Sequence, residues 1–266
     1  MKDPTLASII IGFFVLSAIF YVLERLFAAN RQKILRRGFK TDLIYWFFTP
    51  IFTKAIEKIL VALALVVIFR EGLQDIKLRI EHPTGFISTL PIWLQAFLLL
   101  FVGDVLQYWI HRWFHGKRLW KFHAVHHSSE DLDWLSAVRQ HPVNDWASRV
   151  LSAVPLLAMG FNPLHVVAYI PFLTLYAIGL HANVNWTFGP LKYMIASPVF
   201  HRWHHTSQEE GLDKNFAGLF PVIDMVFGTY YMPKGKFPEK FGAVPPVPEG
   251  FWAQMIYPFR RAKKKS

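Results

Sequence analysis

Histidine is the residue type whose number and spacing first suggest chemistry in this chain. Of 12 histidines, 11 lie between positions 111 and 205, and eight of them form one HxxxH and two HxxHH motifs. On a helix, spacings of three and four place side chains on one face, so each motif can direct several imidazoles at one point. Two HxxHH motifs would arise by chance roughly once in several thousand sequences. The pattern therefore predicts metal binding by His111, His115, His123, His126, His127, His201, His204 and His205.

The number of clustered histidines indicates more than one metal ion. A structural zinc ion takes four protein ligands, and a catalytic zinc ion takes three plus water. Eight histidines exceed one such site, and a binuclear centre fits the count. Imidazole binds zinc, copper, iron and nickel, so the ligand type leaves the metal open. The chain has no cysteine, which excludes disulfides, iron–sulfur clusters, thiolate-ligated haem and cysteine-type zinc fingers within it.

The composition is that of a protein embedded in lipid. Of 266 residues, 53% are hydrophobic and only 18% are charged. The net charge of +11 arises mainly from ten basic residues in two acid-free clusters, at 31–40 and 260–265. The rest of the chain is almost neutral, so we expect no nucleic-acid partner. Basic clusters beside apolar segments are instead typical of the cytoplasmic side of a membrane.

Four long apolar stretches predict the membrane-embedded elements. Residues 4–23 predict a retained transmembrane helix with its N-terminus outside, since the basic cluster at 31–40 follows it. Charges interrupt 43–69, which predicts an interfacial piece followed by a span, and 88–110 predicts another span. Residues 150–191 predict a helical hairpin that turns at Gly160-Phe161-Asn162-Pro163. The histidine-rich segments on either side of this hairpin should therefore share the cytoplasmic face.

The histidine motifs, with their surroundings, resemble those of a known family. The segments His111-Arg-Trp-Phe-His115, His123-Ala-Val-His126-His127 and His201-Arg-Trp-His204-His205 look like the histidine boxes of the fatty acid hydroxylase and sterol desaturase superfamily. Residues 213–230 resemble the closing motif of that family, and especially of its alkylglycerol monooxygenase and bacterial sterol-desaturase-like branches. The resemblance covers roughly residues 95–232.

This resemblance implies an all-α integral membrane protein with four to five transmembrane or re-entrant helices and a cytoplasmic, histidine-rich helical cap. It implies membrane anchor helices at 1–90, a catalytic domain at 91–235 and a Pro-rich, basic C-terminal tail at 236–266. The implied centre holds two iron ions and uses O₂ to hydroxylate or desaturate a C–H bond of a membrane lipid. The eight box histidines become metal ligands, and His181 matches the position of a further ligand. Some members have another histidine four residues later, where this chain has Asn185.

Two further residues are candidates for binding the metal or for supporting its ligands. Asp104 precedes His111 by seven residues and should share its helix face, where an intramembrane carboxylate needs a partner. His141 matches a family position but stands before Pro142, so a local hydrogen bond is the alternative.

Electrons must come from another protein, because the chain has no Gly-rich dinucleotide fingerprint and no fused haem-binding module. The resemblance implies a ferredoxin or a cytochrome of the b5 type, with its reductase. Basic residues around Lys117 and Arg118 could dock such a carrier, although lipid headgroups explain them equally well. The compact chain without a retrieval signal favours a bacterial inner membrane. A membrane zinc-dependent hydrolase and a metal transport or storage protein remain the alternative functions.

Overall fold

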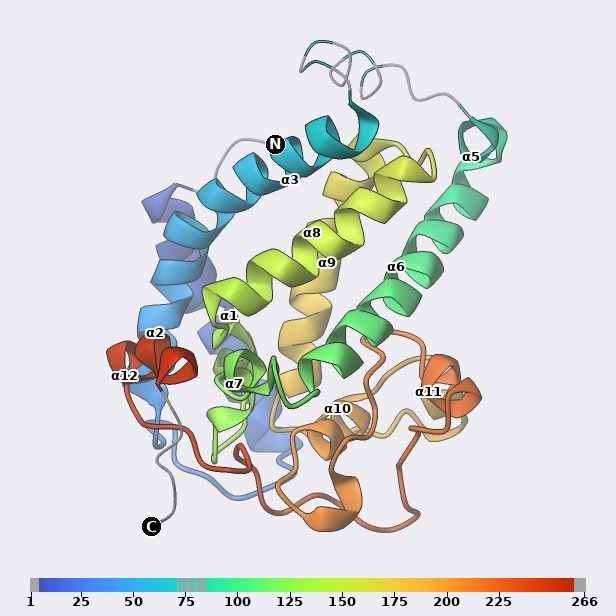
Figure 1. Cartoon of the computed structure of the whole chain (residues 1–266). Coiled ribbons are helices and arrows are strands. Elements are labelled where there is room, and N and C mark those ends of the chain that lie inside the picture. Colours follow the sequence, from blue (N-terminus) through green and yellow to red (C-terminus); the bar gives the residue numbers. More distant parts are fainter. Residues whose placement is uncertain are drawn as a thin grey trace.

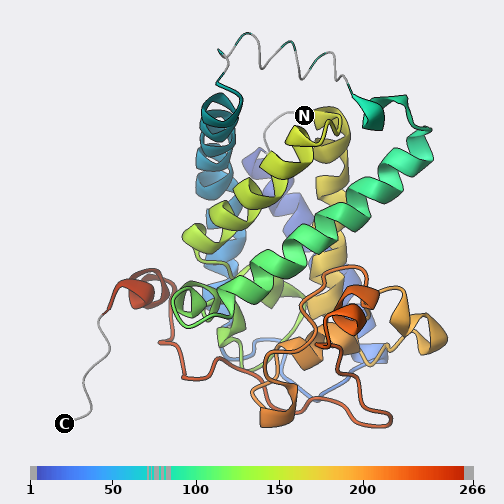
Figure 2. The same ribbon diagram turned by 45° about the vertical axis from the view of Figure 1, so that its right-hand side comes forward.

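The computed structural model describes residues 5–70 and 85–260, together with residues 72, 74, 78 and 81. Its described residues form helices and loops, with two isolated β-bridges and no strand. Figures 1 and 2 show the long helices in the upper part of the molecule and the short helices α7, α10, α11 and α12 in the lower part. The predicted all-helical class is confirmed.

Three helices are long and apolar enough to cross a membrane: α1 (Leu6–Leu26), α6 (Ile92–Phe114) and α9 (Pro163–His181). They match the apolar stretches expected at 4–23, at 88–110 and in the second arm of the hairpin. Thr5 caps α1 by accepting a hydrogen bond from the Ser8 N–H at 3.2 Å, which fixes where the first span begins. Few residues of these helices are buried inside the protein, as expected for helices in contact with lipid.

Three further helices are shorter and pack against the spans or against one another. The helix α2 (Phe39–Phe48) continues through a π-helical turn, η1 (Thr49–Thr53), into α3 (Lys54–Phe69). The first arm of the hairpin is α8 (Pro142–Ala158), which begins eight residues earlier than the apolar run suggested. It starts there because the His141 side chain caps it and Pro142 occupies its first position. Whether α3 and α8 also span the bilayer stays a prediction.

The helix α8 lies between α3 and α6 and packs against both of them, with α9 behind it (Figure 1). Val154 of α8 packs with Leu65 of α3, and Leu156 of α8 packs with Leu99 of α6. On the other side, Phe20 of α1 stacks on Trp134 with 5.6 Å between ring centroids. These contacts fix the helices relative to one another and so help to position the histidine-rich segments that follow or precede them.

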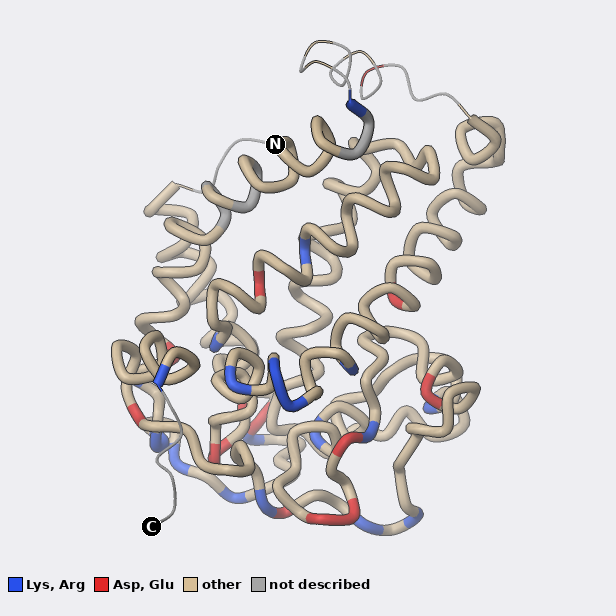
Figure 3. Tube along the Cα trace, in the orientation of Figure 1, with Lys and Arg blue, Asp and Glu red and all other residues tan. Residues whose placement is uncertain are grey.

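Charged residues gather in the lower part of the molecule, whereas the upper parts of the long helices carry few (Figure 3). The first basic cluster, residues 31–40, lies between α1 and α2 on this lower side. The second cluster is described only as far as Arg260, and the rest of it lies outside the described residues. The segment 236–260 packs against the histidine-rich lower part of the molecule, here called the cap (residues 115–141 and 182–260), and forms α12 (Phe251–Ile256) and η6 (Tyr257–Phe259). The expected division at residues 90 and 235 stays a prediction.

Candidate metal centre

The clustered histidines sit at helix ends and on short helical turns just below the spans. His111 lies in the last turn of α6 and His115 caps that helix, while His181 ends α9. The second motif runs from α7 (Trp120–His123) into η2 (His126–Ser128). The third lies on α10 (Pro198–His204), where Ser197 caps the helix by accepting the Phe200 N–H at 3.2 Å. Four segments of the chain thus meet at one place.

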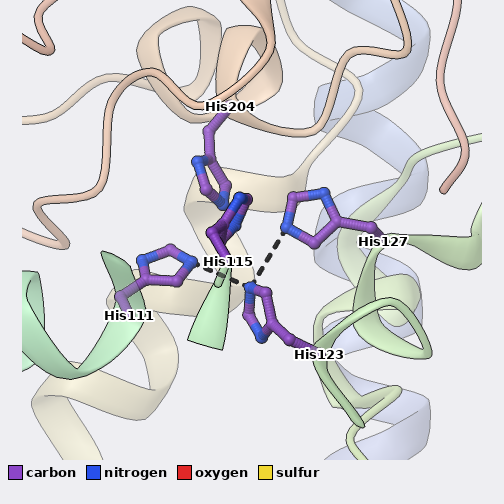
Figure 4. Close-up of side chains that lie close together, drawn as sticks. All are labelled: His111, His115, His123, His127 and His204. Carbon is purple, nitrogen blue, oxygen red and sulfur yellow. Dashed lines mark hydrogen bonds between the residues drawn. The ribbon is translucent and has the colours of Figure 1, made fainter. Parts of the chain in front are cut away.

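The imidazoles divide into two groups. In the five-histidine group, two contacts join ring nitrogens of different members, and Figure 4 shows the rings converging. In it, Nε2 of His123 lies 3.0 Å from Nε2 of His111 and 3.1 Å from Nε2 of His127. The ligand atoms of the group all lie within 4.8 Å of one another. Its members are His111, His115, His123, His127 and His204.

The four-histidine group comprises His126, His181, His201 and His205. Its Nε2 atoms also face one another: that of His181 lies 3.1 Å from that of His126 and 3.2 Å from that of His201. Nε2 of His205 lies 3.1 Å from that of His201. The four side chains come from η2, α9 and α10, and all four residues are buried.

The spacing of these nitrogens is that of ligands around a metal ion. Two nitrogens that each lie about 2.1 Å from one ion, at angles of about 90–110°, are about 3.0–3.4 Å apart. The five contacts in the two groups measure 3.0–3.2 Å. In the five-histidine group, Nε2 of His115 and of His204 are buried with no hydrogen-bond partner among the described residues. The nitrogen spacing of each group therefore fits a metal ion. In the five-histidine group, these two unpaired nitrogens are available as further ligands.

The second ring nitrogen of most of these histidines donates a hydrogen bond, which fixes the tautomer that leaves Nε2 free for a metal. His111 Nδ1 donates to the Phe216 carbonyl at 2.8 Å, and His204 Nδ1 to the Lys214 carbonyl at 2.7 Å. The other acceptors are Asp213 for His115, Asn144 for His123, the Arg139 carbonyl for His126 and the Ala177 carbonyl for His181.

Burial keeps the imidazoles neutral, as metal ligands must be. It lowers the pKa of His123, His126 and His127 well below the usual value of 6.5, and the neighbouring imidazoles lower it further. The same two causes lower the pKa of the three histidines on and after α10. Lone pairs on these rings are therefore available at neutral pH.

The two groups are neighbours. The rings of His127 and His205, which belong to different groups, stack with 4.3 Å between their centroids. Neighbours in the sequence also belong to different groups: His127 and His204 lie in the five-histidine group, and His126 and His205 lie in the four-histidine group. The arrangement is that of one binuclear centre and not of two remote sites.

A buried ion network supports the four-histidine group from the N-terminal part of the chain. Asp42 of α2 accepts hydrogen bonds from Arg36 at 2.7 Å and from Arg139 at 2.5 Å. Arg36 also donates through Nε to Asp133 at 2.6 Å. All four side chains are almost completely buried. Because the Arg139 carbonyl accepts from His126, residues 36 and 42 help to position a candidate ligand.

The remaining predicted site residues lie outside the two groups. The Asp104 carboxylate accepts the backbone N–H groups of residues 218–220 at 2.7–3.0 Å and contacts no imidazole. His141 caps α8 through Nδ1, and its Nε2 donates to the Met255 carbonyl at 3.2 Å. Asn185 is exposed, and its backbone N–H donates to the Phe27 carbonyl at 2.9 Å. Asp104 thus acts on the loop that carries Phe216, the acceptor for His111.

Several supporting residues escaped prediction from the sequence. Glu24, in the last turns of α1, accepts the Trp134 N–H at 3.0 Å and the Asn183 N–H at 2.9 Å. It thereby ties the first span to the segments next to His126 and His181. A carboxylate at the end of an apolar span is a signal that could have identified it. Asn144 and Asp213 carry no comparable signal, because polar residues beside histidines are common in loops.

An all-helical chain with candidate membrane spans and two adjacent polyhistidine groups is an integral membrane protein with a candidate metal centre. The sequence model of the fatty acid hydroxylase family matches residues 96–229, about half of the chain. The chain belongs to this family.

Three curated relatives illustrate the range of the family. The ornithine lipid hydroxylase of Rhizobium tropici is 33% identical over 66% of this chain and 53% of its own length. The human alkylglycerol monooxygenase is 34% identical over 52% of this chain and 30% of its own length. The sphingolipid C4-hydroxylase of Schizosaccharomyces pombe is 28% identical over 67% of this chain and 68% of its own length. The match to this chain thus spans about half of the ornithine lipid hydroxylase and about a third of the alkylglycerol monooxygenase. No solved structure matches significantly.

Proposed function

We propose that this protein oxidises a C–H bond of a membrane lipid with O₂, by hydroxylation or desaturation, at a centre that holds two iron ions. The observation that carries the proposal is the convergence of nine imidazoles into two adjacent groups with ligand spacing. The names of the relatives, which are lipid hydroxylases and monooxygenases, support it and favour hydroxylation.

In this proposal, the five-histidine group and the four-histidine group each hold one iron ion. Five imidazoles exceed the four ligands of a structural zinc ion, and imidazole is a suitable ligand for iron. Two bound iron ions would supply the redox chemistry with O₂ that no amino-acid side chain provides. The carbonyl and carboxylate acceptors hold the rings in place, and Asp104 holds the loop that carries one of these acceptors.

The protein also shields and orients the reacting groups. Phe216 covers the five-histidine group, with its ring centroid 4.9 Å from that of His115 and 5.7 Å from that of His204. Burial of the candidate ligands excludes bulk water from the centre. The outward-facing side chains of α1, α6 and α9 contact the bilayer, so a lipid can approach the centre from the membrane without crossing water. The substrate we propose is therefore a lipid of the surrounding bilayer.

The proposed electron donor is an acidic ferredoxin or a cytochrome of the b5 type, reduced by its own reductase. The chain has no acidic residue between 105 and 129, and Lys117 and Arg118 are exposed in this segment. Trp120 lies in the same segment, with its ring centroid 4.9 Å from that of His115. A basic surface directly beside the five-histidine group supports docking of an acidic carrier there.

The orientation we propose places the histidine centre on the cytoplasmic face, in a bacterial inner membrane. The first basic cluster lies on the same side of the molecule as the histidines, which fits the positive-inside rule (Figure 3). The similarity to the Rhizobium protein supports the bacterial assignment.

The first experiment is metal analysis of the detergent-purified protein by mass spectrometry, with Mössbauer or EPR spectra. The test variants are His126→Ala and His204→Ala, which remove one candidate ligand from each group, and the double variant. We expect about two iron ions per chain, roughly one of them lost in each single variant. Stoichiometric zinc in natively expressed protein, silent to reduction, would overturn the oxidase proposal and favour the hydrolase.

A further inference from the structure

The C-terminal helix α12, with the turn η6 that follows it, has two different faces. Phe251 and Gln254 are 4% and 2% exposed and face the protein. Trp252, Ile256 and Phe259 are 75%, 51% and 66% exposed. Their spacings of four and three place these three apolar side chains on one side of the helical segment. Large exposed apolar side chains grouped in this way mark an interaction surface.

The inner face of α12 contacts residues beside the second histidine motif. The Phe251 ring lies 4.9 Å from the Tyr45 ring. Gln254 Nε2 donates to Ser128 Oγ at 3.1 Å, and Ser128 follows His127 directly in η2. The Met255 carbonyl accepts from His141, the residue that caps α8. A displacement of α12 would therefore be transmitted to η2 and to the start of α8.

The outer face lies next to other exposed apolar side chains. Phe251 packs on Phe48, and Phe48 stacks on Phe52, with ring centroids 4.9 Å and 5.2 Å apart. Phe52 and its neighbour Ile51 are exposed on η1, in the helical run that leads into α3. Figures 1 and 2 show α12 at the edge of the molecule, beside the lower end of this run. The exposed face of α12 thus continues an apolar surface.

The sequence that follows this face is strongly basic. Residues 260–265 contain five Lys and Arg and no acid. A short amphipathic helix with aromatic side chains on one face, next to clustered basic residues, is typical of a segment that lies in the headgroup region of an anionic bilayer. The combination of exposed apolar side chains on α12, η6 and η1 with clustered basic residues favours an anionic lipid surface over an acidic protein as the occupant, because a lipid surface offers both anionic headgroups and an apolar boundary.

We propose that α12 and η6 bind the anionic bilayer surface through Trp252, Ile256 and Phe259, and that this contact holds the second histidine motif in place through Gln254. The first part of the proposal is independent of the proposed function. The second part rests on it, because it assumes that η2 carries metal ligands.

The cysteine-free chain allows a direct test of the first part. A nitroxide label is placed at Trp252→Cys or Ile256→Cys, in nanodiscs of phosphatidylcholine with or without phosphatidylglycerol. Labels at Phe14→Cys on the first span and at exposed Glu239→Cys are the lipid and solvent controls. We expect the label at position 252 to collide with O₂ more than with a water-soluble nickel chelate, as at position 14. An accessibility like that at position 239 would overturn the proposal.

The contribution of the basic residues is tested in the same nanodiscs. Phosphatidylglycerol should increase the ratio of O₂ to chelate collisions at position 252 severalfold. The triple variant Lys263→Glu, Lys264→Glu, Lys265→Glu should lose this increase. A response to phosphatidylglycerol that is unchanged by charge reversal would show that charge does not draw the segment to the membrane. An increase produced instead by an added acidic protein would reassign the surface to a protein partner.

The second part is tested by metal retention against a chelator. Gln254→Leu keeps the volume but removes the donor to Ser128, and Trp252→Glu repels the lipid surface. Each should release metal at least roughly threefold faster, a smaller effect than the about 10–100-fold of a direct ligand partner. Phe237→Glu, on an exposed side chain elsewhere in the cap, is the matched control. Unchanged release with a lipid-immersed label would overturn only the second part, and iron-free protein with an immersed label would overturn only the proposed function.

Discussion

The five-histidine and four-histidine groups differ in their distance from solvent and in what holds their rings. As whole residues, His111 and His115 of the larger group are more exposed than the members of the smaller group, although the His115 side chain itself is only 6% exposed. The loop 213–216 supplies acceptors for three of the five rings in the larger group. In the smaller group, Nδ1 of His201 and of His205 has no partner among the described residues. The larger group is thus held by a loop of the cap, and the smaller one by burial and by the N-terminal ion network.

This difference suggests a division of tasks between the two ions of the proposed centre. The larger group adjoins the basic surface at Lys117 and Arg118, where electrons would arrive. The smaller group includes His181, the last residue of the candidate span α9. We therefore expect metal in the larger group to exchange more readily, because three of its rings depend on the loop 213–216, in which Asp213 is exposed.

Loss of a ligand should have the largest effect and should separate the groups. His205→Ala removes a ligand of the smaller group, and His115→Ala one of the larger group. Each variant should lose about one metal ion per chain, and its lipid-oxidising activity should fall more than about 100-fold. This loss is larger than the about 10–100-fold expected when only a hydrogen-bond partner of a ligand is removed. Metal analysis and turnover assays measure both. If either variant keeps two ions, the partition into groups is wrong.

Removal of Asp42 should weaken the smaller group and the fold together. Asp42→Ala leaves Arg36 and Arg139 buried without their shared carboxylate, which should cost about 3–5 kcal/mol of unfolding free energy. Denaturant unfolding in detergent measures it. Glu130→Ala is the matched control, since its exposed pair with Arg37 contributes about 0–1 kcal/mol. Equal losses in the two variants would contradict the role given to the network.

Removal of the Asp213 carboxylate should weaken only the larger group. Asp213→Ala takes away the acceptor for His115 Nδ1 and should reduce metal affinity there about 10–100-fold. Asp213→Asn should be milder, because Asn keeps an acceptor oxygen and tolerates the backbone φ of 54° at this position. Chelator titration with separate occupancies for the two ions measures the effect. A matching loss from the smaller group would count against independent support.

Removal of the cap of α10 should have the smallest effect and should act on both groups. Ser197→Ala removes the hydrogen bond to the Phe200 N–H and should cost about 1 kcal/mol of stability. Because α10 carries His201 and His204, which belong to different groups, both sites should lose metal slightly and equally. Thermal unfolding and metal retention test this. A loss confined to one site would show that α10 does not act as a rigid unit.

The sequence predicted much of the local structure correctly. The apolar runs identified the spans α1, α6 and α9, because a helix that crosses lipid needs about 20 apolar residues. The turn at Gly160 and the cap at Ser197 also followed from residue types. The start of α8 was missed, because Asp145 and Arg149 interrupt the apolar run while pairing with each other at 2.7 Å within the helix.

By itself, the sequence determined which histidines could bind metal and on which helical segments they lie, since these depend on spacing along the chain. Only the tertiary structure decided how they divide into two groups. Consecutive residues on a helix point about 100° apart, so His126 and His127 point in different directions within the centre, and packing decides which of the two groups each one joins. The network of Arg36, Asp42 and Asp133 was equally hidden, because it joins residues up to 97 positions apart. Such pairs leave no local pattern, since burial against distant segments brings them together.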